Sequence, residues 1–254
     1  MIIPVLMYHR IVPKFETGDK YAVSEEEFGR QMKFLSNNGY EPAIVEDMQN
    51  GILDGKKNVV ITFDDGFESD LTLALPILEH YGFKSVNFLV TDFIGTKGYM
   101  NWERIRLLKK KGCSIQSHSI SHQLFEKMSF AEIEKELIVS RELIEKETGC
   151  TPLALSLPRG SMPKFDFSSL FERAGYKYLF TSEPKINKLA SGEKTTIFGR
   201  ILIRSGMGME DFKKAVVSDK FYYLKENSSF KLKNLLKSLI PVEFYYKLWK
   251  QVNS

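Results

Sequence analysis

Short apolar runs alternate with amphipathic segments along most of the chain. Ser24 with Glu27 and Ser129 with Glu132 form capping boxes that open two of the amphipathic segments, in which apolar residues recur at helical spacing. The apolar runs predict strands at 2–8, 58–63, 85–90, 113–116, 153–157, 176–180 and 197–203. This order of strand and helix favours an α/β fold with a largely parallel sheet.

About seven such strand–helix units would let the sheet close as a TIM-barrel-like (β/α) barrel. Periodicity alone does not separate this barrel from a doubly wound sheet. In both architectures functional side chains gather at the carboxyl ends of the strands. We expect one barrel domain over residues 1–219, since 254 residues suffice for a large, well-filled core, and a helical extension over 220–254.

Composition narrows the class of protein. The chain is 43% hydrophobic, which excludes a disordered or fibrous protein. Its formal net charge of +4 is spread along the sequence, so we expect no nucleic acid partner, which would need a concentrated basic face.

Two consecutive carboxylates, Asp64 and Asp65, follow the strand at 58–63 and precede Gly66. Adjacent like charges resist joint ionisation unless a cation or an arginine neutralises one of them, so this pair points to a metal. A plain surface turn is the alternative interpretation, because Asp and Gly are also turn residues.

The segment SHSISH at 117–122 favours the metal. It places His118 and His122 four residues apart, just after the strand at 113–116, and it holds half of the four histidines in the chain. Two imidazoles and one carboxylate bind a divalent metal and leave positions open for water and substrate, which is typical of a catalytic site. The second carboxylate can then act as a base.

Both segments resemble motifs of the polysaccharide deacetylases that share the NodB homology domain, carbohydrate esterase family 4. The family motif TFDDG is intact at 62–66, and the motif H-[S/T]-x-x-H is intact at 118–122. The resemblance runs from Tyr8-His9 to about residue 212 and is closer to the branch with an N-terminal Tyr-His and a Y-P-Y-G-like third motif. It implies a distorted (β/α) barrel of seven strands.

The resemblance also implies a reaction, the removal of N-acetyl groups from the sugars of a polysaccharide or lipid-linked glycan. Asp65, His118 and His122 are expected to hold a divalent metal, zinc first among the candidates. Asp64 is expected to take the proton of the metal-bound water. The alternative for Asp64 is an outer carboxylate that orients a ligand histidine.

The third motif departs from the family pattern. It reads SLPRG at 156–160, without the arginine two residues before the proline that steadies the base. Arg200 resembles an arginine of the same branch and is expected to restrain Asp64 instead; a structural ion pair is an equally good interpretation. Pro158, Arg159 and Gly160 are expected to contact substrate, although Arg159 can equally be a solvated loop residue.

The general acid of the family is also missing, because no histidine follows His122. His9 and His80 remain. His9 lies at the end of the first strand, where the branch has its Tyr-His, and we expect it to act as acid or electrophile. A histidine satisfied within the core is the alternative for His9, and a cap or surface role is expected for His80.

Three functions stay open on these residues. The first is the metal-dependent deacetylase, which hydrolyses the carbon–nitrogen bond of a linear amide. The altered third and fifth motifs suggest a non-catalytic glycan-binding homologue as the second. The third is a non-haem iron oxygenase, which shares the two-histidine, one-carboxylate ligand set but has no need of a second aspartate.

The last 35 residues combine positive charge with apolar side chains. Residues 220–254 hold seven lysines against Glu226 and Glu243, several aromatic residues, and an apolar helix face made of Leu232, Leu235, Leu236, Leu239 and Ile240. This composition favours peripheral contact with a membrane, although a helix that packs on the barrel is the alternative. Since the apolar run at 2–8 reads as a strand rather than a signal peptide, we expect a cytoplasmic protein at the inner membrane face.

Overall fold

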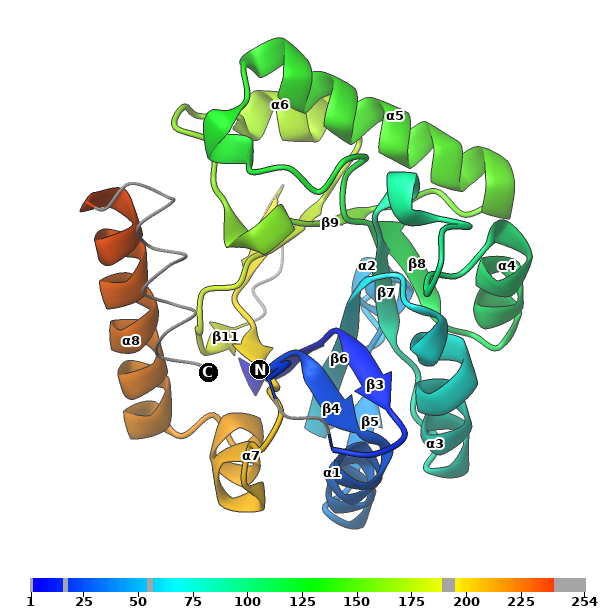
Figure 1. Cartoon of the computed structure of the whole chain (residues 1–254), viewed down its shortest axis with the longest axis vertical. Helices are drawn as coiled ribbons and strands as arrows, with labels where there is room; N and C mark the ends of the chain where they lie inside the picture. The colour runs from blue at the N-terminus through cyan, green and yellow to red at the C-terminus, as the bar shows by residue number, and fades with distance from the viewer. Residues whose placement is uncertain (1, 16–17, 54–56, 189–194, 240–254) are drawn as a thin grey trace.

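A computed structural model shows parallel strands curled inside a ring of helices (Figure 1). It describes residues 2–15, 18–53, 57–188 and 195–239. The main sheet has the order β12-β10-β9-β8-β7-β6-β2-β13, and β5 pairs with β6 at the side of this path. These strands are β2 (Val5–Tyr8), β5 (Tyr40–Pro42), β6 (Lys57–Asp65), β7 (Val86–Leu89), β8 (Ser114–Ser117), β9 (Ala154–Ser156), β10 (Tyr178–Phe180), β12 (Thr196–Phe198) and β13 (Ile201–Leu202).

The strand predicted at 197–203 is broken into β12 and β13, and this break closes the sheet. β12 pairs in parallel with β10, whereas β13 pairs in parallel with β2 at the other end of the strand order. One segment of chain therefore joins both ends of the sheet. Counted as a single strand, it leaves seven strands in the path, and the distorted (β/α) barrel is confirmed.

Gly199 lies at this break. A Cβ atom there would lie 2.4 Å from the carbonyl oxygen of Glu183 and 2.4 Å from Cβ of Lys185, which no side chain tolerates. The amide of the next residue, Arg200, donates a hydrogen bond of 3.0 Å to the same Glu183 carbonyl. Glycine thus lets a neighbouring loop reach the strand, and the side chain of Arg200 is left fully buried.

The helices cover the outside of the strands. They are α1 (Glu25–Asn37), α2 (Val45–Gln49), α3 (Leu75–His80), α4 (Trp102–Lys110), α5 (Phe130–Thr148), α6 (Ser168–Arg173), α7 (Met209–Val216) and α8 (Lys220–Leu239). Both predicted capping boxes are confirmed, at Ser24 for α1 and at Ser129 for α5. Each serine side chain accepts the amide of a glutamate three residues on, which satisfies an N–H that the first turn leaves unpaired.

Helix α3 is preceded by an irregular turn. Asp70–Ala74 form a π-helical turn, closed by a hydrogen bond from the Leu75 amide to the Asp70 carbonyl, and α3 follows. Pro76 explains the position of the α-helical start, because proline lacks the N–H that a helix interior needs but fits the first turn.

Several short elements complete the fold. The first predicted strand is interrupted at Pro4, so that β1 (Ile2–Ile3) pairs antiparallel with β11 (Asn187–Lys188). β3 (Arg10–Val12) and β4 (Ala22–Ser24) form a separate parallel pair. Single 3-10 turns occur at Thr91–Phe93, Phe125–Lys127 and Pro158–Gly160.

The alternation of β6 determines which of its side chains enter the barrel. Val59, Ile61 and Phe63 pack with residues of α1 in one apolar cluster, whereas Val60 packs in a second cluster with residues of β7, β10 and β12. Because successive side chains of a strand point to opposite faces, Thr62 and Asp64 share the inner face with Val60. Asp64 therefore points into the barrel.

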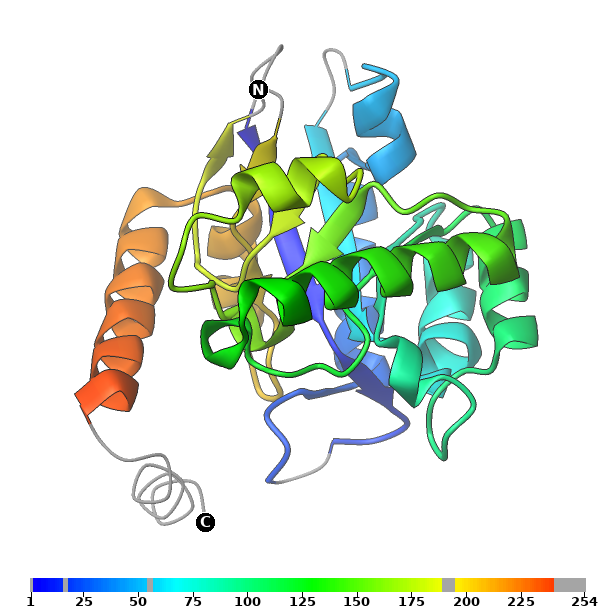
Figure 2. The ribbon, with the colours of Figure 1, turned by 90° about the horizontal axis from the view of Figure 1, so that it is seen from above.

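The strands of the main sheet all run toward one end of the molecule. In Figure 2 the first strands start at the top, and the loops that follow β3 and β7 lie at the bottom. The polar side chains that the sequence places after strands are therefore brought to this end, which we call the mouth of the barrel.

Candidate active site

The two histidines and two aspartates of the motifs meet at the mouth of the barrel. Asp64 and Asp65 end β6, and His118 and His122 lie in the loop after β8. His118 Nε2 lies 3.7 Å from Asp64 Oδ2 and 3.6 Å from Asp65 Oδ1, and His122 Nε2 lies 3.4 Å from Asp65 Oδ1. Residues about fifty positions apart in the sequence thus form one cluster.

Asp64 is paired with Arg200 deep in this cluster. The guanidinium donates two parallel hydrogen bonds, from Nη1 to Oδ1 at 2.7 Å and from Nη2 to Oδ2 at 2.8 Å. Both side chains are buried. Burial opposes ionisation of Asp64, but the charge and hydrogen bonds of Arg200 outweigh it and hold the pKa of this carboxyl well below its usual range. Asp64 is therefore a carboxylate at neutral pH.

Ser156 explains how Arg200 reaches Asp64. This serine stands where the family pattern has its arginine, and its small side chain leaves space for the guanidinium of another segment. Arg200 Nη2 donates to Ser156 Oγ at 2.8 Å, and the hydroxyl donates in turn to Asp64 Oδ2 at 3.3 Å. Thr62 Oγ1 accepts a further bond from Arg200 Nη1 at 3.2 Å. Sequence analysis did not single out Ser156, although its place in the third motif was a usable signal.

Asp65, His118 and His122 fit a divalent metal. One ligand atom from each lies within 4.8 Å of the other two. A tetrahedral ion with bonds of about 2.1 Å holds its ligand atoms about 3.4 Å apart, close to the two distances from Asp65 Oδ1 to the histidine nitrogens. Within the described residues this Oδ1 is buried and accepts no hydrogen bond, which a buried carboxylate oxygen avoids unless a cation completes its environment.

The two aspartates have opposite electrostatic environments. Burial and the neighbouring charge of Asp64 raise the pKa of Asp65 to about 7, whereas Asp64 is kept ionised by Arg200. Of the two aspartates, only Asp65 therefore lacks a cationic partner, and a bound metal ion would be that partner.

His118 is oriented for binding through Nε2. Its Nδ1 lies 2.8 Å from the carbonyl oxygen of Ser156, which can only accept a hydrogen bond, so the proton of the neutral ring is on Nδ1. Burial lowers the pKa of His118 to about 4 and that of His122 to about 3. Both rings are therefore neutral and have a lone pair available.

Glu136 holds the loop that carries these histidines, and sequence analysis missed it. Its buried carboxylate, on α5, accepts hydrogen bonds from the Ile120 amide at 2.6 Å, the Ser121 amide at 3.0 Å and the Ser121 hydroxyl at 2.6 Å. The loop is strained, since His122 has φ +57°. Glu136 offsets this strain by fixing the two residues that precede His122.

His9 lies beside the cluster, whereas His80 does not. The Nδ1 atom of His9 is buried and makes no hydrogen bond to the described residues, and the ring contacts Tyr21 with centroids 4.6 Å apart. Burial lowers the pKa of His9 to about 4; the charge of Asp64 acts to raise this pKa and that of Arg200 acts to lower it. His80 is exposed in the last turn of α3 and contacts Tyr81.

The third motif lines one side of the site. Arg159 and His122 line a cavity of about 350 Å³ together with Phe93, Ser121, Gln123, Leu124 and Lys127. Pro158, which precedes Arg159, is buried. Gly160 has φ +66°, and a Cβ atom there would lie 2.8 Å from Cβ of Ser182, so this turn requires glycine.

Aromatic rings continue this side of the mouth. Phe93 lies 5.9 Å from His122 and 4.8 Å from Tyr99, and Tyr99 stacks on Phe67 at 4.7 Å, all between ring centroids. The rings come from the loops after β6 and β7, so the metal-ligand cluster has a continuous apolar edge.

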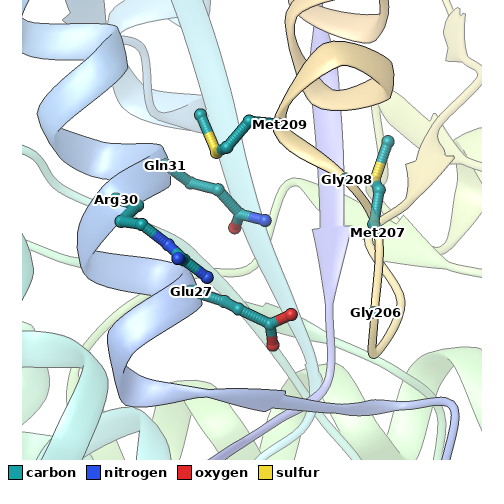
Figure 3. Close-up of a pocket in the computed structure, with 7 residues that line it drawn as sticks. All are labelled: Glu27, Arg30, Gln31, Gly206, Met207, Gly208 and Met209. Atoms are coloured by element: carbon teal, nitrogen blue, oxygen red, sulfur yellow. The ribbon is translucent and has the colours of Figure 1, made fainter.

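A second hollow, of about 200 Å³, lies between α1 and the loop before α7 (Figure 3). Glu27, Arg30 and Gln31 face the loop across it. Glu27 is engaged in the capping box and Gln31 accepts the Tyr8 hydroxyl, so these two polar groups already have partners within the fold. None of the motif residues lines this hollow.

Comparison with known proteins agrees with this geometry. A family model described as polysaccharide deacetylase matches residues 53–179. Bacillus subtilis YxkH, whose name describes a polysaccharide deacetylase, is 30% identical over 186 residues, covering 72% of this chain and 65% of YxkH. The Staphylococcus aureus poly-β-1,6-N-acetyl-D-glucosamine N-deacetylase is 27% identical over 182 residues, covering 65% of this chain and 62% of the relative. Each match spans less than two thirds of the relative's length.

A solved structure gives the same fold. Streptococcus pyogenes deacetylase PplD, in complex with acetate, superimposes with a TM-score of 0.74 at 25% identity, covering 85% of this chain and 98% of PplD. The family model covers half of the chain and includes both intact motifs. The chain therefore belongs to the polysaccharide deacetylase family with the NodB homology domain, carbohydrate esterase family 4.

Proposed function

We propose that this protein is a metal-dependent hydrolase that removes N-acetyl groups from the sugar residues of a glycan. The observation that carries the proposal is the division between two adjacent carboxylates: Asp64 is paired with Arg200, and Asp65 faces two neutral histidines. The acetylated glucosamine polymer named for the Staphylococcus aureus relative and the acetate bound to PplD support an acetamide substrate.

Asp65, His118 and His122 would hold the metal. Their two nitrogens and one oxygen are a donor set that suits zinc. A bound divalent metal would polarise the acetyl carbonyl and lower the pKa of a bound water.

Asp64 is the proposed base. A carboxylate has about four lone-pair positions, of which Arg200 fills two and the Ser156 hydroxyl fills one. One position remains to accept the proton of the attacking water. Arg200 keeps Asp64 ionised and fixes its plane, so we assign it the role of restraining the base. An oxygenase would gain nothing from this buried pair.

His9 is the proposed acid. Its depressed pKa makes it neutral at pH 7, so it must first gain a proton, and the charge of Asp64 is the largest influence that favours this. The unpartnered Nδ1 at the mouth is then available to protonate the departing amine or to donate to the substrate.

The substrate is proposed to lie along the edge formed by Arg159 and the aromatic rings. Pro158 and Gly160 shape the turn that presents Arg159, which lines the same cavity as Phe93 and His122. Apolar sugar faces pack on aromatic rings, and a guanidinium offers several donors to sugar hydroxyls.

The two aspartates should respond differently to substitution. Asp65→Ala should abolish zinc binding measured by titration calorimetry, because it removes a ligand. Asp64→Asn should bind zinc as the wild type does but release acetate from chito-oligosaccharides about 10²–10⁴-fold more slowly, since it cannot accept a proton.

Chelation should abolish wild-type activity. If Asp64→Asn releases acetate as fast as the wild type does, Asp64 is not the base. If the zinc-loaded wild type releases no acetate from any glycan, a binding module is favoured.

Replacement of His9 should affect catalysis and not metal binding. His9→Gln should lower kcat about 10²-fold with an unchanged zinc Kd, because a proton donor is lost while the ligands stay in place. His80→Gln is the matched control, as this exposed histidine lies on α3. Equal rates in the two variants would show that His9 is not the acid.

Glu136 should control metal affinity through the ligand loop. Glu136→Ala should weaken zinc binding about 10–100-fold, because His122 loses the hydrogen bonds that hold its loop. Glu136→Gln should lie between this variant and wild type, since it retains one acceptor oxygen. Glu142→Ala, an exposed glutamate of the same helix, is the control. A zinc Kd in Glu136→Ala equal to that of the control would contradict the positioning role.

A further inference from the structure

Helix α8 presents a stripe of exposed apolar side chains. Phe221 is 83% exposed, Leu224 64%, Leu232 57% and Leu235 55%. At 100° per residue these four positions fall within an arc of about 80° on one side of the helix. Large apolar residues exposed singly are ordinary, but four on one side of one helix form a stripe, in which the exposed Ser228 separates the first pair from the second. We call this surface the α8 stripe.

The opposite side of α8 holds the helix on the barrel. Tyr222 and Tyr223 are buried in the same apolar cluster as Phe212 of α7. Asn227 donates hydrogen bonds of 3.0 Å to the Glu183 carboxylate and to the Pro184 carbonyl. The first part of α8 therefore packs on the barrel, as in the alternative interpretation of the sequence. Only this side of the helix makes the contact. Three members of the expected apolar face lie outside the described part of the chain, namely Ile240 and the side chains of Leu236 and Leu239.

Charge along α8 is distributed to match the stripe. The exposed Lys225 and Lys231 project on either side of it, within about 60° of its edges. Glu226 is the only acidic residue between 220 and 239, and it lies toward the packed side, where it pairs with Arg204 at 3.4 Å. The outward face thus combines apolar and positive side chains and carries no negative charge.

The helix is placed beside the mouth of the barrel. In Figure 2, α8 runs down the flank of the molecule, and its C-terminal end lies at the same end as the loops that follow the strands. A planar surface along this flank would therefore also approach the mouth. In the described part of the chain, no helix has the length and hydropathy to cross a bilayer.

We propose that the α8 stripe binds the surface of a bilayer that contains anionic lipid, with the helix lying in the plane of the interface. Leucine and phenylalanine side chains would enter the boundary of the acyl chains while the flanking lysines contact lipid phosphates. A second copy of the chain is a poorer occupant, because a two-fold contact through the stripe would place lysines against lysines. The proposal concerns attachment and does not depend on the deacetylase reaction.

Sedimentation of the full chain with vesicles tests the proposal. Vesicles of phosphatidylcholine with phosphatidylglycerol should bind the wild type, and pure phosphatidylcholine should bind it at least about tenfold more weakly, since each lysine near an anionic surface favours binding about fivefold. Phe221→Ser/Leu224→Ser should lose binding to the mixed vesicles. Leu107→Ser/Val139→Ser, which removes exposed apolar residues of α4 and α5, should bind as the wild type does.

Three results would overturn the proposal. Wild type could fail to bind mixed vesicles, or the stripe variant could bind as tightly as the control variant, which would assign binding to another part of the chain. Sedimentation velocity could also show a wild-type dimer that the stripe variant lacks, without vesicle binding, which would assign the stripe to a second copy. Circular dichroism of both variants distinguishes loss of binding from loss of fold.

Discussion

The buried ion pair between Arg200 and Asp64 is the interaction on which the site depends. Removing water from two charges costs several kcal/mol for each ion, and only close geometry with further hydrogen bonds offsets this cost. Here the geometry is bidentate, and Ser156, Thr62 and the Thr181 carbonyl, at 3.1 Å from Nε, satisfy the remaining donors of the guanidinium. Loss of either partner would leave the other charge buried and unpaired, which typically destabilises a protein by about 3–5 kcal/mol.

The closure of the barrel and the ion pair have the same origin. The segment 196–202 must change partner from β10 to β2, and the change occurs at Gly199 and Arg200. Phe198 lies in the inner apolar cluster, and Arg200, two residues further on, points to the same inner face. The proposed base is thus restrained by the residue at which the sheet closes.

The ion pair also gives the two adjacent aspartates, Asp64 and Asp65, different electrostatic environments. Asp64 keeps its charge because Arg200 neutralises it, and Asp65, whose pKa is raised to about 7, requires a cation to ionise fully at neutral pH. Environments that push the pKa values of adjacent carboxyls apart give them different roles. The tandem aspartates are therefore suited to one base and one metal ligand.

Much of this architecture could be predicted from the sequence. Strand–helix alternation indicates a parallel sheet, parallel strands bring their carboxyl ends together, and so Asp64 and His118 were expected to meet. Resemblance to the family pointed to Arg200. Capping boxes at Ser24 and Ser129 marked two helix starts because their signals lie within four residues.

Contacts between distant segments were harder to predict. Ser156 and Glu136 act through hydrogen bonds to other elements, and nothing in their local sequence announces those partners. The break at Gly199 escaped prediction because apolar residues continue on both sides of it. On α8, the local sequence does not distinguish Tyr222 and Tyr223 from exposed aromatic residues. Only the packing of the helix on the barrel shows that they are buried.

The pH dependence of acetate release in Arg200→Gln tests the central claim most directly. Arg200 lowers the pKa of Asp64, so its neutral replacement should raise that pKa and move the acidic limb of the kcat/KM profile to higher pH, with zinc Kd little changed. Zinc titration of the same sample checks that the site is intact. An acidic limb at the wild-type position, in a variant that still binds zinc, would contradict the account.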